Sequence, residues 1–319
     1  MPKPANICFD VALALLQGKR EVQEDALDSK FDAETGVGYV VLADGMGGHQ
    51  AGDVASKIVV TEVFNELKRQ SKDFGKPEFD FRRVLTKAAS HANSCLRSHG
   101  AANPETTGMG ATLIAAILLQ NRLFWISVGD SPLYIFRGSK LRQINEDHSL
   151  APQIDFMAQS GVISKEAAQD HPDRNCLTSA LIGEDIPQID CPSEPFILQP
   201  DDVVIAASDG LQFLEDDRIG QVIEEQRKKS SIEVIRHLTE EVVKLDDPHQ
   251  DNVSVSIIRV LGPAKKRKTV GARKKLPVRK GRALVGSAVV ARLASRPLVA
   301  GARARIVAFL NSLSKNSLR

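Results

Sequence analysis

Four acidic residues stand at the ends of apolar segments that are predicted to form buried strands. Asp44, Asp130 and Asp209 each follow such a segment, and Asp251 precedes the last segment of this kind. A carboxylate costs several kcal/mol to desolvate when it has no partner, and the sequence places no matching set of Lys or Arg beside neighbouring strand ends. Because oxygen ligands without His or Cys favour hard cations, we expect this group to bind Mg²⁺ or Mn²⁺ rather than Zn²⁺.

Each of these acids alone also fits a simpler interpretation. An Asp-Gly pair after a strand, as at Asp44 and Asp209, is most often a turn, and Asp251-Asn252 is equally typical of a turn or a cap. All four in one chain are harder to explain in this way, and together they favour a metal cluster.

A second charged group lies upstream, in residues 20–25, between the first two predicted strands. Arg20 offers a planar fork that suits bidentate binding of a phosphate. Glu24 and Asp25 are placed to orient metal-bound water. Taken by itself, such a stretch is more often a solvated charge cluster than a site.

The loop of residues 44–52 contains four glycines and leads into a predicted helix. Glycines allow the backbone to approach a ligand closely, although a loop of this kind fits a nucleotide site as readily. No P-loop is present, and no Cys has the Arg that a cysteine-phosphatase loop requires. Neither Asp44 nor Asp209 is followed two residues later by the second Asp of an aspartyl-phosphate enzyme. The remaining chemistry is hydrolysis by metal-activated water without a covalent intermediate.

The elements that must position these residues follow from apolar periodicity. The pattern predicts helices at Gly52–Arg69 and Phe81–Leu96, short helices at 150–161 and 165–169, and helices at 216–229 and 232–245. The predicted strands are 9–16, 37–43, 111–119, 122–128, 133–136, 203–207 and 253–260. Strands and helices are segregated instead of alternating strictly, which indicates an α+β fold.

Charge divides the chain into two parts. Residues 263–319 contain 16 Lys and Arg and no Asp or Glu, so residues 1–262 hold the other 26 basic residues and all 40 acidic ones, a net charge of about −14. We therefore predict a catalytic domain over 1–262 and a basic, largely disordered tail over 263–319, with a short amphipathic helix at 302–314. The tail fits a solvated segment, an anionic membrane surface, nucleic acid, or docking on the acidic domain.

The four cysteines form no C-x-x-C pair, which favours reduced thiols in a cytosolic protein. The N-terminal residues MPKPANICFD lack the apolar core of a signal peptide. No uncharged stretch of the tail is long enough to span a bilayer. We therefore expect a cytoplasmic protein, peripheral to the membrane if the basic tail binds there.

Taken together, the motifs resemble those of the protein phosphatase 2C (PPM) family of metal-dependent serine/threonine phosphatases, and its bacterial branch in particular. The similarity extends over about 250 residues. It rests on Arg20-x-x-x-Glu24-Asp25, Asp44-Gly45-Met46-Gly47-Gly48-His49, Gly110-Ala111-Thr112, Val128-Gly129-Asp130-Ser131, Asp147-His148-Ser149-Leu150, the segment from His171 to Leu181, Ser208-Asp209-Gly210-Leu211 and Asp251-Asn252-Val253-Ser254.

This resemblance implies a four-layer α-β-β-α sandwich, with two packed antiparallel sheets flanked by helices. It implies that Asp44, Asp209 and Asp251 hold one Mn²⁺ or Mg²⁺ ion, and that Asp44 and the Gly45 carbonyl hold a second. Glu24 and Asp25 act through water. A third ion is held by Asp130, which shares Asp209. Arg20 grips the substrate phosphate, and a water that bridges the first two ions attacks phosphorus in line.

The sequence departs from the family pattern at several positions. Gln23 stands where bacterial members usually have Asn, and Pro132 and Ser179 each replace an Arg. None of these positions is a metal ligand, so the differences are expected to affect contacts of the flap, residues 151–175. Met46 stands where animal members have a His, so water is the expected source of the leaving group's proton, and the three nearby histidines are expected to be structural: His49, His148 and His171.

The leading hypothesis is hydrolysis of phosphoserine and phosphothreonine on proteins, which reverses a cognate serine/threonine kinase, by a monomeric catalytic domain. A competing hypothesis is a pseudophosphatase that binds phosphoproteins without hydrolysis. Loss of metal ligands would indicate it, and every matched ligand position is intact. A further alternative makes the basic tail a targeting element for membrane or nucleic acid, which is compatible with phosphatase activity.

Overall fold

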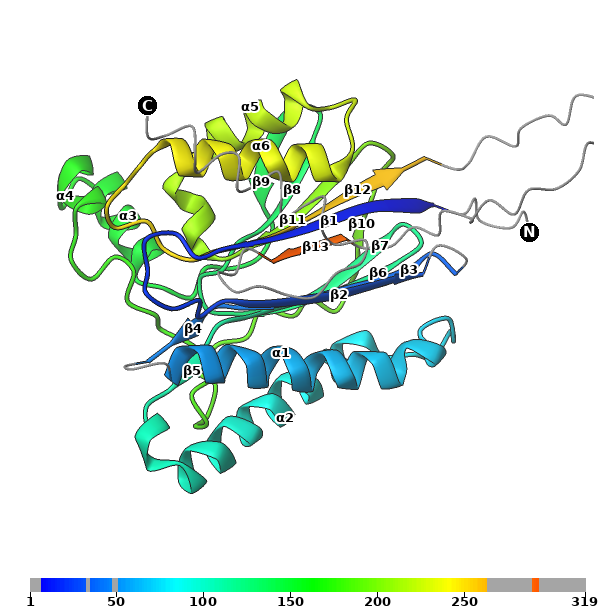
Figure 1. Ribbon diagram of the computed structural model, residues 1–319, viewed down its shortest axis with the longest axis horizontal. Coiled ribbons are helices and arrows are strands. Elements are labelled where there is room, and N and C mark those ends of the chain that lie inside the picture. The colour runs from blue at the N-terminus through cyan, green and yellow to red at the C-terminus, as the bar shows by residue number, and fades with distance from the viewer. Residues whose placement is uncertain (1–6, 33–34, 48–50, 263–288, 293–319) are drawn as a thin grey trace, which may run out of the picture.

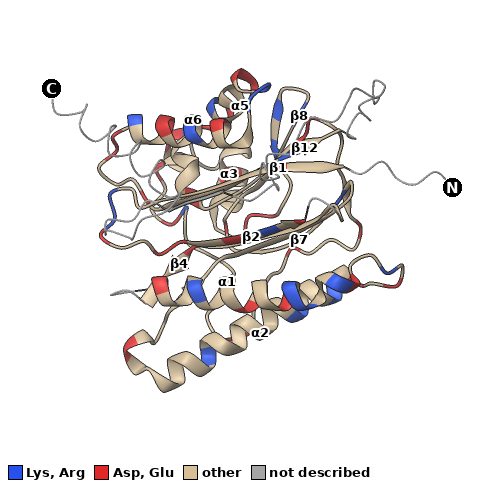
Figure 2. Cartoon of the chain, turned by 45° about the vertical axis from the view of Figure 1, so that its right-hand side comes forward, with Lys and Arg blue, Asp and Glu red and all other residues tan. Residues whose placement is uncertain are grey.

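Four layers of secondary structure make up the computed structural model, which describes residues 7–32, 35–47, 51–262 and 289–292. Two sheets pack face to face, and a pair of helices covers the outer face of each (Figure 1). The α+β sandwich implied by the sequence is confirmed. Charged residues lie along the outer helices (Figure 2), as expected for the solvated sides of amphipathic helices.

The first sheet has the spatial order β13-β1-β12-β11-β8-β9. Its strands are β1 (Cys8–Leu16), β8 (Leu133–Arg137), β9 (Lys140–Gln143), β11 (Val203–Ala207), β12 (Val253–Leu261) and β13 (Val289–Arg292). All neighbours are antiparallel except β13, which runs parallel to β1. Helices α5 (Asp216–Glu225) and α6 (Ser231–Lys244) cover its outer face.

The second sheet has the order β10-β7-β6-β3-β2 and is antiparallel throughout. Its strands are β2 (Ala26–Asp32), β3 (Val37–Ala43), β6 (Leu113–Leu119), β7 (Arg122–Val128) and β10 (Phe196–Ile197). Helices α1 (Ala51–Gln70) and α2 (Phe81–Ala102) lie against it. A small ladder of β4 (Gly45–Met46) and β5 (Gly110–Ala111) extends toward the start of α1.

Side-chain alternation along β3 explains how one strand serves two cores. Tyr39, Val41 and Ala43 pack against α1 and α2, whereas Val40 and Leu42 face the other sheet. Successive residues of a strand point to opposite faces, so a fully buried strand reads as a continuous apolar run. This run made β3 predictable.

Several elements differ from the prediction. Strands β2, β9 and β10 were not expected, because they are short or carry charged residues at the sheet edge. Helix α2 continues six residues beyond Leu96, and Arg97 there donates to the Gly183 carbonyl. The strand expected at 111–119 is divided at Thr112. The helix predicted to reach residue 229 ends at Glu225.

Short helices α3 (Ala151–Gln159) and α4 (Lys165–Gln169) form the flap, close to their predicted positions. Three 3₁₀ turns complete the described part of the chain, at Ser71–Asp73, Pro104–Thr106 and Asp209–Phe213. Among the described residues, no helix combines the length and apolar character needed to cross a membrane.

The predicted boundary at residue 262 remains a prediction. Strand β13 lies beyond it, in the segment assigned to the tail, and pairs with the outer edge of β1 from Ala12↔Val289 to Leu15↔Arg292. An edge strand offers unpaired backbone groups, and the backbone of β13 pairs with those on this side of β1. The helix predicted at 302–314 and the basic run at 265–282 lie outside the described residues.

Candidate metal centre

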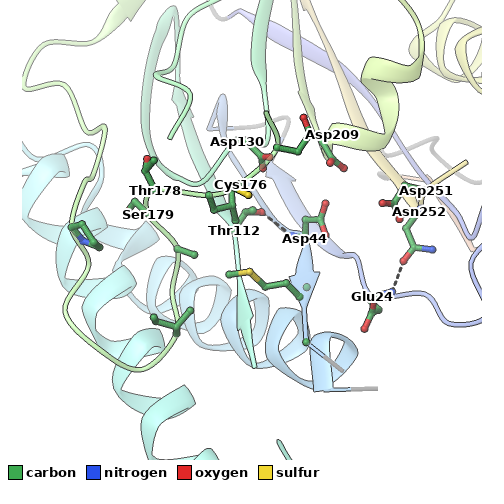
Figure 3. Close-up of a pocket in the computed structure, with 18 of the residues that line it drawn as sticks. Glu24, Asp44, Thr112, Asp130, Cys176, Thr178, Ser179, Asp209, Asp251 and Asn252 are labelled. Carbon is green, nitrogen blue, oxygen red and sulfur yellow. Dashed lines mark hydrogen bonds between the residues drawn. The ribbon is translucent and has the colours of Figure 1, made fainter. Parts of the chain in front are cut away.

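The topology brings the four strand-end acids to one end of the sandwich. Strands β11 and β12 are antiparallel neighbours, so Asp209, after β11, lies beside Asp251, before β12. In the other sheet, β3 and β7 are both antiparallel to β6 and so run in the same direction. Asp44 and Asp130, which follow these strands, therefore lie at the same end of the sheet. Figure 3 shows the four side chains around a common pocket.

This pocket has a volume of about 750 Å³. Its lining includes Arg20, Glu24, the Asp44–Gly47 loop, Asp130, residues 175–180 after the flap, Asp209, Asp251 and Asn252. Seven of the eight predicted site residues therefore line one pocket. The exception is Asp25, whose side chain is buried behind the lining.

Gly45 lies where the backbone closely approaches two neighbouring carbonyl groups. A Cβ atom at this position would be 2.0 Å from the carbonyl oxygen of Gly52 and 2.6 Å from that of Glu24, so no residue with a side chain fits there. The Gly45 amide also donates to the Glu24 carbonyl at 3.1 Å. The glycine thus ties the Asp44 loop to the segment that carries Arg20 and Glu24.

Asn252 organises the residue 20–25 segment. Its side chain accepts from the Glu24 amide at 2.7 Å and donates to the carbonyls of Gln17 and Val22 at 2.7 and 3.0 Å. Gln23 assists, because its side chain donates to the Leu16 carbonyl and accepts from the Asp25 amide. The Gln found in place of Asn at position 23 therefore has a defined structural role.

Two further residues position the acids, and sequence reasoning gave them no role. Thr112 accepts from the Asp44 amide through its hydroxyl at 2.9 Å, and its own amide donates to the Asp44 carbonyl at 2.8 Å. Ser208 donates to Asp25 at 2.7 Å. Both residues belong to motifs that resemble the family, and each is a polar residue beside an apolar run, but neither signal indicated which group it contacts.

Arg20 lies at the mouth of the pocket and contacts one of the acids. Its guanidinium donates to Asp251 Oδ2 at 2.5 Å, and its side chain is 55% exposed. It is the only Lys or Arg that lines the pocket within the described residues. One cation therefore faces seven carboxylates: those of the four strand-end acids and those of Glu24, Glu184 and Asp185.

Burial, followed by repulsion from neighbouring carboxylates, raises the pKa values of Asp25, Asp44, Asp130 and Asp209. Burial raises the pKa of Asp25 to about 7, assisted by the nearby Asp209 and opposed by the hydrogen bond from Ser208. Burial, Asp209 and Asp147 raise the pKa of Asp130 to about 7. The pKa of Asp44 also lies well above its usual range because of burial, and then because of Asp25 and Asp209. Burial and Asp251 raise the pKa of Asp209.

These carboxylates fit divalent cations. Asp25 Oδ1 and Asp209 Oδ1 are buried without a hydrogen-bond partner, a costly state for a carboxylate oxygen. The donor set is oxygen only, which suits Mg²⁺ or Mn²⁺. A bound cation would supply the missing partner and reverse the pKa shifts.

The histidines near the pocket occupy structural positions where they are described. His148 is buried and accepts from the Gly129 amide at 3.2 Å; its pKa is lowered by burial, so the ring is neutral at pH 7. His171 accepts from the Asp173 amide. His49 and Gly48 lie outside the described residues.

Ser179 and Pro132, which replace Arg residues of the family pattern, form hydrogen bonds with nearby backbone groups. The Ser179 hydroxyl donates to the Gln188 carbonyl at 2.7 Å and accepts from the Gln188 amide at 3.1 Å, which fixes the chain after the flap at the pocket wall. The Pro132 carbonyl accepts from the Ala207 amide at 3.1 Å. Neither residue touches the strand-end acids through a hydrogen bond.

We expect the metal-free protein to lose stability as the pH rises. A carboxyl group whose pKa is higher in the folded than in the unfolded state favours folding below its unfolded pKa, near 4, and this contribution is lost as the pH rises through the folded pKa. For Asp25 and Asp130 that window extends to about pH 7. In EDTA, the melting temperature is therefore expected to fall by several degrees between pH 5 and 8.

Saturating Mn²⁺ is expected to remove this decline, and Asp130→Asn to reduce it in EDTA. Differential scanning fluorimetry at matched ionic strength measures both. A melting temperature in EDTA that rises across this pH range would contradict the pKa shifts.

Comparisons with known proteins show which proteins this chain is similar to. Residues 17–247 match the family described as protein phosphatase 2C. The chain is 36% identical over 181 residues to the serine/threonine phosphatase stp of Listeria monocytogenes, covering 57% of this chain and 69% of that one. It is 34% identical over 151 residues to the serine/threonine protein phosphatase PstP of Mycobacterium tuberculosis, covering 47% of this chain and 28% of that one.

Solved structures give the same result. The catalytic domain of PstP in complex with two manganese ions superposes with a TM-score of 0.64 at 27% identity, over 80% of this chain and 99% of that one. Stp1 from Staphylococcus aureus superposes with a TM-score of 0.64 at 25% identity, over 82% of this chain and 99% of that one.

Proposed function

The chain belongs to the protein phosphatase 2C family and is a metal-dependent protein-serine/threonine phosphatase, and we propose that the pocket around Asp44 is its active site. The observation that carries the proposal is the convergence of four strand-end carboxylates on one pocket that is lined by a single cationic side chain among the described residues. A phosphorylated side chain carries two negative charges at neutral pH, so it binds there only when cations are present.

The enzyme uses Mn²⁺ or Mg²⁺, as the family does. We propose that Asp44, Asp209 and Asp251 hold one ion and that Asp44 and the Gly45 carbonyl hold a second. Asp130 and Asp209 are proposed to hold a third. When bound, such ions lower the pKa of water and neutralise the phosphoryl oxygens. The resemblance to the family and the buried, unpartnered Asp209 oxygen support this assignment.

The chain's own residues are proposed to bind and orient. Arg20 turns from Asp251 toward the substrate phosphate, which its exposure at the pocket mouth allows. Glu24 and Asp25 accept hydrogen bonds from water inside the pocket. Asn252 holds the residue 20–25 segment beside Asp251, and Thr112 holds Asp44, through the hydrogen bonds described above, so both are proposed to be positioning residues.

Phosphate release from a phosphothreonine peptide tests the site. With Mn²⁺, full-length protein is expected to release phosphate in repeated turnovers, and excess EDTA is expected to abolish release until Mn²⁺ is restored. Full activity in excess EDTA would exclude metal-dependent hydrolysis at this pocket. A parallel assay with the same peptide lacking phosphate measures the background.

The substrates are phosphorylated proteins. We propose that a cognate serine/threonine kinase supplies them, since hydrolysis of a phosphoester is regulatory only when an opposing kinase forms it. We also propose a monomeric catalytic domain in a reducing, cytoplasmic compartment. All four cysteines are free, which supports a reducing environment.

For the tail we propose binding to an anionic membrane surface. Residues 263–319 carry 16 basic residues and no acidic ones, and each Lys or Arg near a charged membrane contributes roughly 1 kcal/mol. The tail contains no Tyr or Trp on which bases could stack, which makes nucleic acid the weaker candidate.

Deletion of residues 263–319 is expected to leave kcat on a soluble phosphopeptide within about twofold, because every proposed site residue lies before residue 262. Full-length protein is expected to co-sediment with phosphatidylserine vesicles at physiological salt, and the truncated form is not. Neutral vesicles and a DNA shift assay are the controls. An insoluble or inactive truncated protein would show that the tail, including β13, belongs to the catalytic fold.

A further inference from the structure

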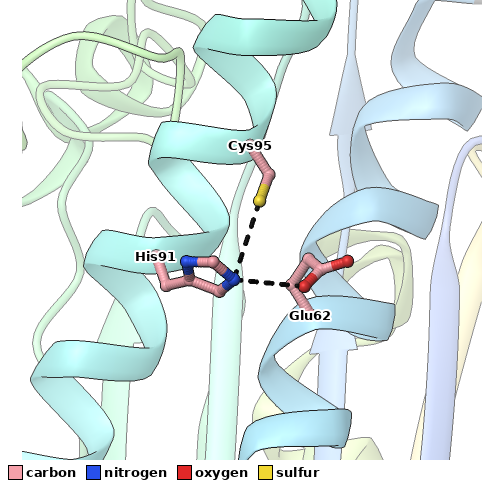
Figure 4. Close-up of side chains that lie close together, drawn as sticks. All are labelled: Glu62, His91 and Cys95. Carbon is pink, nitrogen blue, oxygen red and sulfur yellow. Dashed lines mark hydrogen bonds and ion pairs between the residues drawn. The ribbon is translucent and has the colours of Figure 1, made fainter.

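Three side chains of metal-binding type meet between α1 and α2, outside the catalytic pocket. Glu62 comes from α1, and His91 and Cys95 come from α2 (Figure 4). The ligand atoms of the three residues all lie within 4.8 Å of one another. None of the three lines the pocket around Asp44, so the proposed catalytic reaction gives them no role.

Helix geometry explains the arrangement. His91 and Cys95 are four positions apart in the sequence, so they lie on one face of α2, one turn apart. The apolar faces of α1 and α2 share a core that includes Val59 and Val63 on α1 and Ala88 and Ala92 on α2. Packing of this core, rather than a bound ion, holds Glu62 opposite the His-Cys pair.

The distances approach those between ligands of a tetrahedral ion. His91 Nε2 lies 3.3 Å from Glu62 Oε2 and 3.8 Å from Cys95 Sγ. Bond lengths of about 2.0–2.1 Å to nitrogen and oxygen and about 2.3 Å to sulfur place nitrogen about 3.3 Å from oxygen and about 3.6 Å from sulfur in a tetrahedral site. Two of the three distances therefore already approach tetrahedral values, and the third pair, Glu62 and Cys95, lies within 4.8 Å and must move closer on binding.

We propose that Glu62, His91 and Cys95 bind one Zn²⁺ ion, with water as the fourth ligand. A mixed set of nitrogen, sulfur and oxygen ligands suits Zn²⁺, whereas the oxygen-only pocket suits Mg²⁺ and Mn²⁺. The chain would thus hold two kinds of ion at two sites. A thiolate and a carboxylate together balance the two charges of the ion.

Binding requires Cys95 to release its proton to solvent as the Zn–S bond forms. Burial and the adjacent Glu62 raise the pKa of this thiol, so it keeps its proton in the absence of metal. Partial exposure of the group gives an ion access, since the His91 side chain is 60% exposed and that of Glu62 is 34% exposed. The bound ion would connect α1 to α2 near the middle of both helices.

Cobalt(II) is the probe, because a thiolate ligand gives it a charge-transfer band in the near ultraviolet that oxygen ligands do not. Full-length protein in saturating Mg²⁺ and a phosphine reductant is titrated with Co²⁺ and then with Zn²⁺. We expect one equivalent of Co²⁺ to develop the band and one equivalent of Zn²⁺ to remove it. Absence of the band would overturn the site.

The variants assign the ligands. Cys95→Ser is expected to abolish the band, and His91→Ala and Glu62→Gln are expected to weaken Co²⁺ binding more than about tenfold, since even partners of metal ligands contribute 10- to 100-fold. Cys176→Ser is the control, because Cys176 is exposed and lines the catalytic pocket. Retention of the band in Cys95→Ser, its loss in Cys176→Ser, or unchanged affinity in His91→Ala or Glu62→Gln would each contradict the proposal.

A second readout separates loss of ligands from loss of fold. In saturating Mg²⁺, Zn²⁺ is expected to raise the melting temperature of the unmodified protein and not that of His91→Ala. Without Zn²⁺, the His91→Ala and Glu62→Gln variants are expected to melt near the unmodified protein and to keep its phosphatase rate. An equal Zn²⁺-induced rise in His91→Ala would place the ion elsewhere.

Discussion

Asp209→Asn is expected to lower kcat on a phosphothreonine peptide by at least about 100-fold while the fold survives. Asp209 is proposed to serve two of the three ions, and it lies in one pocket with Asp44, Asp130 and Asp251. A carboxamide has one oxygen donor and no charge, so metal affinity falls. Metal-dependent charge stabilisation is worth several kcal/mol, and each 1.4 kcal/mol is a factor of ten in rate.

The variant is expected to melt at a higher temperature than the parent in EDTA, because the substitution removes one of the mutually repelling carboxylates that are buried here. This combination of lower activity and higher metal-free stability separates loss of metal from loss of fold. Calorimetric titration with Mn²⁺ then gives the number of ions bound. Unchanged kcat at saturating Mn²⁺ would remove Asp209 from the metal centre.

Asp201→Asn is a matched control for this substitution. Asp201 is an exposed acid at the opposite end of the same strand, β11, and has a positive φ of 71°, a conformation that Asn tolerates. We expect it to leave both kcat and Mn²⁺ stoichiometry unchanged. Asp130→Ala is an intermediate case, because Asp130 is proposed to bind the third ion only, so two ions should remain.

Strands that are buried on both faces could be predicted closely from the sequence. β7 and β11 have the predicted bounds, because a run such as Val203–Ala207 is entirely buried and every residue in it is apolar. Edge strands gave a weaker signal: β2 contains only three apolar residues and carries Asp28 and Lys30, which lowers its strand propensity. Strand β2 forms because it pairs with β3 along its whole length. No local sequence pattern indicates this pairing.

The acids of the site could be selected from the sequence because each adjoins an apolar run. The residues that orient them could not, because their partners are distant in the chain. Thr112 contacts Asp44 across 68 positions, Ser208 contacts Asp25 across 183, and Asn252 contacts Glu24 across 228. Only the pairing of strands brings these residues together, so their contribution depends on topology rather than on local pattern.

Arg20→Ala is expected to reduce kcat/KM about 10- to 150-fold without reducing metal binding. Loss of a charge-assisted contact to phosphate is worth about 1.5–3 kcal/mol, which corresponds to that range. In the present structure Arg20 donates to Asp251 Oδ2, so its removal also deprives the acidic cluster of its adjacent cation. Mn²⁺ affinity should therefore be equal or higher, whereas inhibition by inorganic phosphate should weaken in parallel with kcat/KM.

Two comparisons test whether the guanidinium itself is required. Arg20→Lys keeps the charge but cannot form the bidentate contact, so kcat/KM should fall between that of the unmodified enzyme and that of Arg20→Ala. Lys19→Ala removes the adjacent cation, which pairs with Asp246 at 2.8 Å and does not line the catalytic pocket, and should leave kcat/KM unchanged. Equal losses in Arg20→Ala and Lys19→Ala would indicate general attraction of the anionic substrate by positive charge. A loss confined to Arg20, together with weaker phosphate inhibition, would indicate direct contact with the substrate phosphate.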